Sequence, residues 1–467
     1  MFYEANLFFF LLSNAGLLAL QYRREKQRER KAASTVVEQP KDVEAEEATL
    51  DGELENVSNG VEANSDTVRT FQLNFFIPYA LAVAADWLQG PHIYAIYKYE
   101  KDIPEQTVAM LYATGFVSGG ISASFAGSLA DRYGRKQACL LYCCLYVVTC
   151  MTMLSDNLAV LFFGRLCGGV GTTLLFSVFE AWVISDYHNK CLELSGLKLG
   201  SVFPAMTTIS CVVAIISGVF GEFLVSLFGS RQWPFVASIG CSGGAAYFIS
   251  RLWKENYGSK MTADKAALYE IRAGIQAIIQ DRRMLAIGLT SCFFEGTMYL
   301  FIFFWTAALK SVRLAADVEE EPPYGIIFAC FMCSMMVGST IFTLKGTAKS
   351  TGLSTSMLLK VTGVVSCCLS IAVMAKSEWL LFWTLCLIEG CIGAYFPSMA
   401  YLKSEFIEDG IRGTIYSILR FPLNVFVVVA HSLDVEGDAH RNHVFLTCAG
   451  LLLVAFLMTQ KYLPAKA

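Results

Sequence analysis

The feature that most constrains the fold of this chain is a series of apolar stretches, each long enough to cross a lipid bilayer as a helix. A spanning helix needs roughly 20 mainly apolar residues, because its backbone must satisfy its own hydrogen bonds where water is absent. Hydrophobic residues make up 55% of the chain and charged residues only 16%. Such stretches occur at 5–21, 73–90, 106–130, 138–154, 158–184, 200–228, 234–252, 284–309, 324–344, 356–375, 379–401, 412–431 and 444–463. The sequence therefore predicts an all-α membrane protein.

The first stretch, 5–21, stands apart from those that follow it. A secretory signal peptide is the alternative, but no basic segment precedes the stretch and its positive charge follows it. We expect an extra N-terminal transmembrane helix instead. The remaining stretches divide six and six around a polar segment. The predicted organisation is an extra helix at 1–21, a linker at 22–70, a six-helix half at 71–252, a second linker at 253–283 and a second six-helix half at 284–467.

Charge is segregated along the first linker. Residues 23–31 hold six basic side chains, and residues 38–66 hold ten carboxylates against a single lysine, Lys41. The acidic run is poor in aromatic residues and cannot bury a core, so we expect it to be disordered. The basic run directly follows an apolar stretch, which indicates a topological anchor at a membrane surface. Nucleic-acid binding is not expected.

Basic residues also predict the orientation, since cytoplasmic loops carry an excess of Lys and Arg. One orientation places nearly all basic segments on the cytoplasmic side, whereas the opposite loops are poor in Lys and Arg or acidic, as at 317–321. The segments placed inside are 22–70, 127–136, 185–199, 253–283 and the turn with Lys345 and Lys349. We expect a multi-pass protein of the cell membrane with its N-terminus outside and its C-terminus in the cytoplasm.

A polar ten-residue motif, GSLADRYGRK, runs from Gly127 to Lys136 between two apolar stretches. Gly127 and Gly134 can supply the positive φ that a tight turn requires. The motif resembles, at every fixed position, the loop signature G-x-L-A-D-R-x-G-R-K of the major facilitator superfamily, although an ordinary basic loop is the alternative. The resemblance implies that Asp131, assisted by Arg135, acts as a latch at a neighbouring helix N-terminus and holds the outward-facing state. It also implies two halves that rock around a substrate near the membrane midplane.

Ionisable side chains within the apolar stretches are candidate functional groups, because they are costly there and face the protein interior or water. The side chains selected as candidates are Asp86, Arg165, Glu180, Glu295, Glu389 and Arg420. Each has a structural alternative. Asp86 could cap a helix end, Arg165 could extend to the membrane interface, and Glu180 could lie solvated near the surface. Glu295 or Glu389 could serve as structural partners of the two arginines.

These residue types favour an anion site beside proton-titratable groups. Arginine suits oxyanions because its planar fork donates parallel hydrogen bonds and stays charged. Glutamate suits proton coupling because partial burial moves its titration toward physiological pH. Arg165 with the glycines that follow it also resembles a second superfamily motif, in which the arginine faces the cavity. Residue types alone do not select a substrate.

Longer segments resemble the molybdate-anion transporter family, in the same order over roughly residues 71–463. They are AADWLQGP (84–91), GRLCGGVGTTLLFSVFEAW (164–182), WKENY (253–257), DRR (281–283), GIIFACFM (325–332), YFPSM (395–399) and RFPLN (420–424). The resemblance implies a secondary active transporter that takes up molybdate. It implies an oxyanion site drawing on Arg165, Arg420, Gln89, Ser177 and Asn424, and proton coupling through Glu180 foremost, with Asp86, Glu295 and Glu389.

Ion coupling has an energetic reason. Moving a dianion against an inside-negative potential costs about 4.6 kcal/mol per 100 mV, twice the single-charge figure. Two protons would make the step electroneutral, and a third would let the potential drive it.

Other functions remain open at this point. Sulfate or another oxyanion is the main alternative substrate, and a non-transporting receptor or scaffold could use the same fold with 22–70 as a docking region. A membrane enzyme is least expected, because no nucleophile–base pair, metal-ligand cluster or phosphate loop is evident. The sixteen cysteines fall mostly in apolar stretches, and the C-x-x-C of Cys330 and Cys333 lacks partner ligands. We expect no cofactor and no metal.

Overall fold

The computed structural model describes residues 2–37, 50–195, 197, 199–258, 275–276, 278, 280–345, 350–407, 412–433, 435 and 437–463. Within these residues every element of regular secondary structure is helical, so the predicted all-α class is confirmed. Each predicted apolar stretch coincides with a long helix. By length and apolar composition, eight described helices could cross a membrane, or nine when the bent pair α4 and α5 counts as one span.

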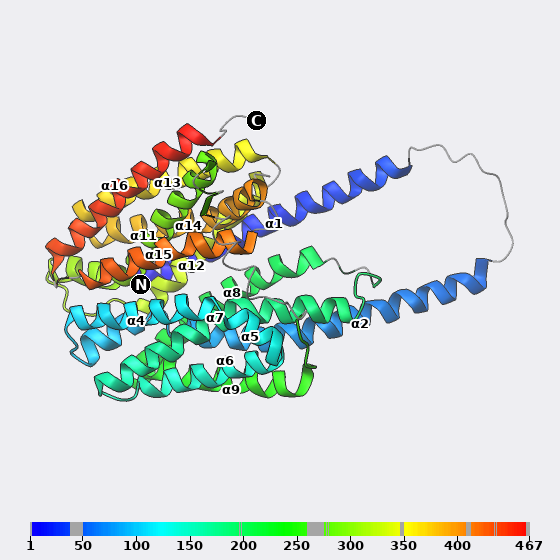
Figure 1. The fold of residues 1–467 in the computed structure, drawn as a ribbon, viewed down its shortest axis with the longest axis horizontal. Coiled ribbons are helices and arrows are strands. Elements are labelled where there is room, and N and C mark those ends of the chain that lie inside the picture. Colours follow the sequence, from blue (N-terminus) through cyan, green and yellow to red (C-terminus); the bar gives the residue numbers. More distant parts are fainter. Residues whose placement is uncertain are drawn as a thin grey trace.

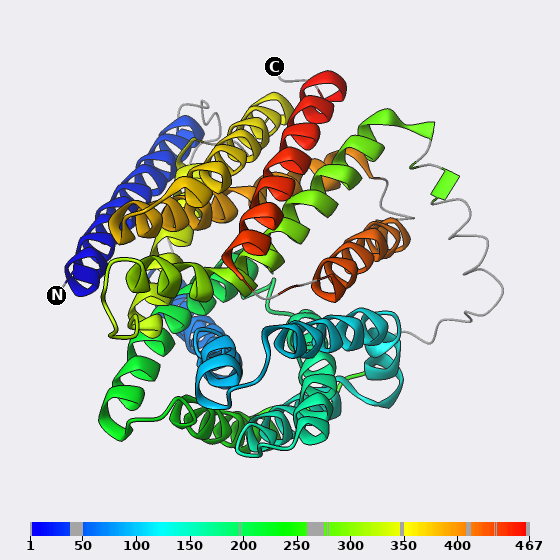
Figure 2. The ribbon, with the colours of Figure 1, turned by 90° about the vertical axis from the view of Figure 1, so that its left-hand side faces the viewer.

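The first half is built from the helices that follow the extra N-terminal helix and precede the linker 253–283. They are α2 (Leu50–Trp87), the short α3 (Ile93–Ala95) and η1 (Ile96–Glu100), α4 (Glu105–Ala123), α5 (Ala126–Tyr133), α6 (Arg135–Thr152), α7 (Leu158–Asn189), α8 (Leu199–Phe228) and α9 (Trp233–Leu252). The second half contains α11 (Arg282–Leu314), α12 (Tyr324–Lys345), α13 (Thr351–Met374), α14 (Glu378–Phe406), α15 (Arg412–Ser432) and α16 (Asp438–Tyr462). Figure 2 shows the two groups side by side, the first coloured blue to green and the second light green to red.

The halves meet along two helix pairs, α8 with α12 and α4 with α15. Glycines permit close approach in the first of these contacts. A Cβ added to Gly218 of α8 would lie 2.6 Å from the carbonyl oxygen of Gly325 in α12, and one added to Gly325 would lie 2.3 Å from that of Gly218. Small residues let helix backbones approach in membranes, where packing rather than the hydrophobic effect drives association.

The extra helix α1 (Phe2–Val37) packs against α12 of the second half. Asn14 Nδ2 donates to the carbonyl oxygen of Cys333 at 3.0 Å, and Arg24 Nη1 donates to that of Leu344 at 3.0 Å. One polar contact therefore lies within the apolar part of α1 and another lies near its basic run. Figure 1 shows that α1 and the beginning of α2 extend together beyond the helical bundle at one end.

The prediction of a disordered linker over 38–66 is wrong for residues 50–66, which form the start of α2, while residues 38–49 lie outside the described part. Residues 22–37, also assigned to the linker, continue α1. Residues 22–37 are rich in Arg, Lys, Gln, Glu and Ala, which are good helix formers, whereas residues 50–66 hold mostly weaker helix formers such as Asn, Asp, Ser and Gly. Because each adjoins an apolar helix, it extends an existing helix and avoids the cost of nucleation.

The resemblance implied that the motif Gly127–Lys136 forms a loop, but most of its residues are helical. Its first part forms α5, which is bent by 52° from α4, and α6 begins at Arg135. Gly134 between them has φ +118°, a conformation that favours glycine. The positive φ expected at Gly127 is wrong, because that residue lies inside α5.

Candidate functional site

Arg165 lies about two turns into α7, a helix capped by Asn157, whose side chain accepts from the N–H of Ala159 at 2.9 Å. The guanidinium lies against α4. Its Nε donates to the carbonyl oxygen of Leu111 at 3.3 Å, and its Cζ is 5.2 Å from the ring centroid of Tyr112. Within the described residues no carboxylate forms an ion pair with Arg165.

Glycines create the room for this arrangement. A Cβ on Gly115 of α4 would lie 2.8 Å from Nη2 of Arg165. A Cβ on Gly169 of α7 would lie 2.3 Å from the carbonyl oxygen of Gly115. A larger residue at Gly169 would separate α4 from α7, whereas one at Gly115 would displace the guanidinium of Arg165. The glycines that follow Arg165 thus allow the close helix approach that the resemblance implied.

Asp86 lies in the last turn of α2 and faces α6. The hydroxyl of Tyr146 donates to its Oδ1 and lies 2.9 Å from Oγ1 of Thr172 in α7. The charge of Arg165 acts on this carboxylate, although the two groups are not in ion-pair contact. The structure therefore brings Asp86 and Arg165 into one electrostatic environment. The side chain of Asp86 accepts from another helix and does not cap its own.

The remaining predicted anion ligands do not gather around Arg165. Gln89 donates to the carbonyl oxygen of Ala85 at 3.0 Å and to Ser238 of α9 at 3.3 Å, inside the first half. Ser177 donates to the carbonyl oxygen of Thr173 in its own helix at 2.6 Å. Asn424 lies between the halves, where a Cβ on Gly120 would approach its Nδ2 to 2.7 Å. Arg420 belongs to α15, but its side chain is outside the described part of the chain.

The four candidate proton carriers occupy different environments. Glu180 is an exposed residue of α7, and Glu389 of α14 is buried at 6% exposure. Neither has a hydrogen bond or ion pair with another described residue. Among the described side chains, no arginine pairs with Glu295 of α11. Its Oε1 lies 3.6 Å from Nζ of Lys403 in α14.

A polar cluster surrounds Glu295. Its Oε1 accepts from Ser291 at 2.6 Å and from the hydroxyl of Tyr395 at 3.1 Å, while Lys403 donates to Ser291 at 2.9 Å. Sequence reasoning missed Lys403 because it follows the apolar stretch 379–401. A signal was present, since Lys403 lies eight residues after Tyr395 and thus returns to the same side of the helix.

The latch residues are arranged differently from the expectation. Asp131 Oδ1 pairs with Nε of Arg135 at 2.7 Å, and Arg135 Nη1 donates to the carbonyl oxygen of Ala181 in α7 at 3.1 Å. The carboxylate at a helix N-terminus is that of Glu255, which accepts from the backbone N–H of Lys136 at 2.7 Å. Among described residues, no hydrogen bond or ion pair joins Asp131 to the second half.

Charged side chains connect the two halves at the opposite end of the bundle. Arg231, before α9, pairs with Glu321, before α12, and also with Glu100 at 3.4 Å. Glu321 accepts from Lys310 of α11 at 2.7 Å. Glu222 of α8 accepts from the backbone N–H of Gly325 in α12 at 2.8 Å. Arg231, Lys310 and Glu321 flank the predicted spans, whereas Glu222 lies within the stretch 200–228 and sequence reasoning missed it.

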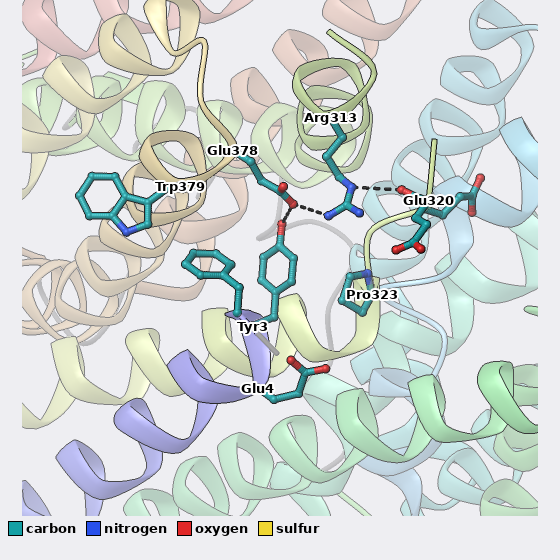
Figure 3. Close-up of a pocket in the computed structure, with 9 residues that line it drawn as sticks. Tyr3, Glu4, Arg313, Glu320, Pro323, Glu378 and Trp379 are labelled. Carbon is teal, nitrogen blue, oxygen red and sulfur yellow. Dashed lines mark hydrogen bonds and ion pairs between the residues drawn. The ribbon is translucent and has the colours of Figure 1, made fainter. Parts of the chain in front are cut away.

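A pocket of about 680 Å³ lies at this same end (Figure 3). In its wall Glu378 accepts from the hydroxyl of Tyr3 and from Nη1 of Arg313 at 2.6 Å. The lining holds one arginine and four glutamates, namely Arg313, Glu4, Glu320, Glu321 and Glu378. This excess of negative charge disfavours an anion. No group of three or more His, Cys, Asp or Glu side chains suited to a metal ion occurs in the described part of the chain.

Comparisons with known proteins agree with this architecture. Residues 47–383 match a family model described as sugar transporters, 12 TM. The molybdate-anion transporter of Danio rerio is 29% identical over 433 residues, covering 83% of this chain and 86% of that protein. That of Xenopus laevis is 29% identical over 408 residues, covering 83% and 85%.

Solved structures share the fold at low sequence identity. The nucleoside transporter NupG superposes with a TM-score of 0.65 at 13% identity, covering 84% of this chain and 98% of that one. A D-xylose-proton symporter superposes with a TM-score of 0.62 at 12% identity, covering 86% and 98%.

Proposed function

Because this chain belongs to the twelve-span transporter family of the major facilitator superfamily that its matching family model describes, we propose that it takes up molybdate into the cell. The predicted resemblance to the molybdate-anion transporters is confirmed, and the chain is a multi-pass membrane transporter rather than an enzyme. The choice of molybdate follows the relatives' names. We also propose residence in the cell membrane, with the N-terminus outside and the C-terminus in the cytoplasm.

The observation that carries the proposal is that most hydrogen-bond donors of Arg165 have no described partner. A guanidinium has five N–H donors, and Arg165 uses one hydrogen bond to Leu111 and no ion pair among the described residues. A cation without a counter-ion is costly inside a membrane protein. A tetrahedral oxyanion would satisfy both the charge and the parallel donors of the fork. Lysine would supply the charge without that geometry.

Two features support an alternating-access cycle. The halves are tied at one end through Arg231, Glu321 and Glu222, whereas Asp131 at the other end makes no described contact with the second half. With the orientation proposed above, this arrangement is closed outside and has its latch released inside. The six-helix halves at 71–252 and 284–467 are proposed as the bodies that rock about the substrate.

Proton coupling is proposed on energetic grounds. Uptake of a dianion against the potential requires at least two compensating charges to be electroneutral. Asp86 is electrostatically linked to Arg165, while Glu180 and Glu389 have no described partner. Oε1 of Glu295 lies 3.6 Å from Nζ of Lys403. These four carboxylates provide the candidate carriers.

The test is uptake of radiolabelled molybdate into proteoliposomes holding the purified full chain, with competition by sulfate and tungstate. We expect saturable uptake, which Arg165→Ala abolishes and Arg165→Lys weakens in affinity. Arg251→Ala, at the exposed end of α9, is the matched control and should transport normally. Absence of uptake by the wild type would favour a receptor or scaffold, and stronger inhibition by sulfate than by molybdate itself would identify sulfate as the substrate.

A further inference from the structure

Three unusual polar side chains lie around Arg165, and none of the contacts described so far explains them. The hydroxyl of Tyr97 is fully buried and has no hydrogen-bond partner among the described residues. Both ring nitrogens of His431 are also buried without a partner, at 1% exposure of the residue. Tyr112, at 5% exposure, makes no hydrogen bond through its hydroxyl to a described residue. Buried polar atoms normally have partners, so the unpaired hydroxyl of Tyr97 and the unpaired nitrogens of His431, near the unbonded hydroxyl of Tyr112, indicate a missing ligand.

Ring contacts place Tyr112 between Arg165 and His431. Arg165 Cζ lies 5.2 Å from the centroid of the Tyr112 ring, and the centroid of the His431 ring lies 6.2 Å from it. The charge of Arg165 acts on Tyr97, Tyr112 and His431 alike. The four side chains therefore form one cluster, which we call the Arg165 cage: Tyr97, Tyr112, Arg165 and His431.

Aromatic packing holds His431 in position without using its nitrogens. Its ring stacks on Phe116 of α4 at 5.9 Å and 9°, and it meets Phe303 of α11 edge-on at 4.8 Å. Phe116 follows Tyr112 by one turn of α4. His431 and Arg165 therefore contact the same helix, α4. The imidazole is thus fixed in space while both of its polar atoms remain unused.

The cage draws on both halves of the molecule. Tyr97 belongs to η1, Tyr112 to α4 and Arg165 to α7, all in the first half, whereas His431 ends α15 of the second half. A transporter that alternates between two states needs substrate contacts from both rocking bodies, since only then does the substrate bias their arrangement. The π-helical turn at Tyr97 is also a geometry often found at functional sites.

Resting on the proposed function, we propose that Tyr97, Tyr112 and His431 complete the oxyanion site of Arg165, with His431 as the contribution of the second half. Arg165 supplies the positive charge and a bidentate fork. The two tyrosine hydroxyls donate to further oxygens of the tetrahedral anion, and an N–H of the neutral imidazole donates to the last. The site binds a tetrahedral oxyanion and selects it by size. The tyrosine hydroxyls and the imidazole N–H belong to aromatic rings that core packing holds in place.

The experiment measures binding and transport separately in the full chain. Tyr97→Phe, Tyr112→Phe and His431→Phe each keep an aromatic ring and remove only the polar atoms. Isothermal titration calorimetry with sodium molybdate should show affinity lowered about 10-fold or more for each variant, the usual effect of losing a hydrogen bond to a charged group. In proteoliposomes KM should rise by a similar factor with the maximal rate less affected.

Tyr142→Phe is the matched control. Tyr142 is also fully buried, but its hydroxyl donates to the carbonyl oxygen of Ala82 at 2.7 Å inside the first half. This variant should lose stability without losing affinity.

The failure of this inference differs from failure of the proposed function. Wild-type affinity and KM in Tyr97→Phe and His431→Phe, together with lost binding in Arg165→Ala, would overturn the cage and leave the transporter intact. A wild-type protein that neither binds nor transports molybdate, sulfate or tungstate would overturn the proposed function itself. Loss of maximal rate alone in His431→Phe would assign His431 to packing between the halves.

Discussion

The side chain of Glu255 caps the first turn of α6 by accepting from the backbone N–H of Lys136 at 2.7 Å. A second hydrogen bond, from the N–H of Gln137, reaches its other oxygen at 3.2 Å. The capping residue comes from the WKENY segment, more than a hundred residues later in the chain. These hydrogen bonds connect the start of the linker between the halves to the N-terminus of α6, next to the motif that contains Asp131.

Replacing Glu255 by Gln should weaken this cap, since a charged acceptor is lost at the positive end of a helix. We expect a loss of about 0.5–2 kcal/mol, the usual range for a helix cap. Thermal unfolding of the purified protein in detergent measures it. Glu193→Gln, an exposed carboxylate between α7 and α8, should leave the melting temperature unchanged. Equal effects of the two substitutions would show that Glu255 does not act as a cap.

Asp131→Asn should slow transport without altering substrate affinity. Among the described residues Asp131 forms an ion pair with Arg135 alone, a partly exposed pair of small energetic value. Its proposed latch contact forms in the opposite, outward-facing state. We therefore expect a several-fold lower maximal rate, an unchanged KM and a population shifted toward the inward-facing state. A change confined to KM would argue against the latch.

The pair Arg231–Glu321 should control closure of the end that we propose to face outside. Glu321→Gln removes the carboxylate that Arg231 and Lys310 share across the two halves. A cysteine introduced on the interior side of the pair should be labelled more by a membrane-impermeant thiol reagent. Turnover should be slower. Exchanging the charges, Arg231→Glu with Glu321→Arg, should partly restore closure. Glu319→Gln, an exposed neighbour, is the control, and labelling raised equally by that change would exclude a specific gate.

Lys403 and Glu295 should behave as a coupled pair. Lys403→Met leaves a membrane-embedded carboxylate with only Ser291 and Tyr395, so it should destabilise more than the double variant Lys403→Met with Glu295→Gln. Each side chain is 18% exposed, so we expect the coupling energy to be about 1–2 kcal/mol, below that of a fully buried pair. A double-mutant cycle on thermal unfolding gives this value. Additive effects would show that the two residues are independent.

Glu180→Gln should flatten the dependence of uptake on an imposed proton gradient. Glu180 lies fifteen residues beyond Arg165 on α7, about 22 Å along the helix, so no ion pair with that arginine is formed. The measurement is uptake at several external pH values with the membrane potential held constant. A wild-type pH profile in the variant would remove Glu180 from the coupling mechanism and leave Asp86, Glu295 and Glu389 to be tested in the same way.

The sequence alone predicted where the helices lie, because membrane spans depend on local runs of apolar residues. Each expected stretch coincides with one helix or, for 106–130, with the bent pair α4 and α5. The family resemblance was evident from short contiguous sequence segments. Local reasoning was wrong where neighbouring structure intervened. Residues 50–66 are helical as an extension of an apolar helix, and Gly127 lies inside α5.

What only the tertiary structure decided is which polar groups meet. Arg165 was evident from the sequence, but Tyr97 and His431 were not, since Tyr97 lies between two predicted stretches and a His in an apolar stretch is ordinarily a core residue. Their significance rests on atoms left without partners, which no linear pattern reveals. Lys403 with Glu295 and Glu255 with Lys136 likewise join residues more than a hundred positions apart. Helix packing sets these pairs, because the membrane fixes the direction of each helix while the facing side chains fix its rotation and neighbours.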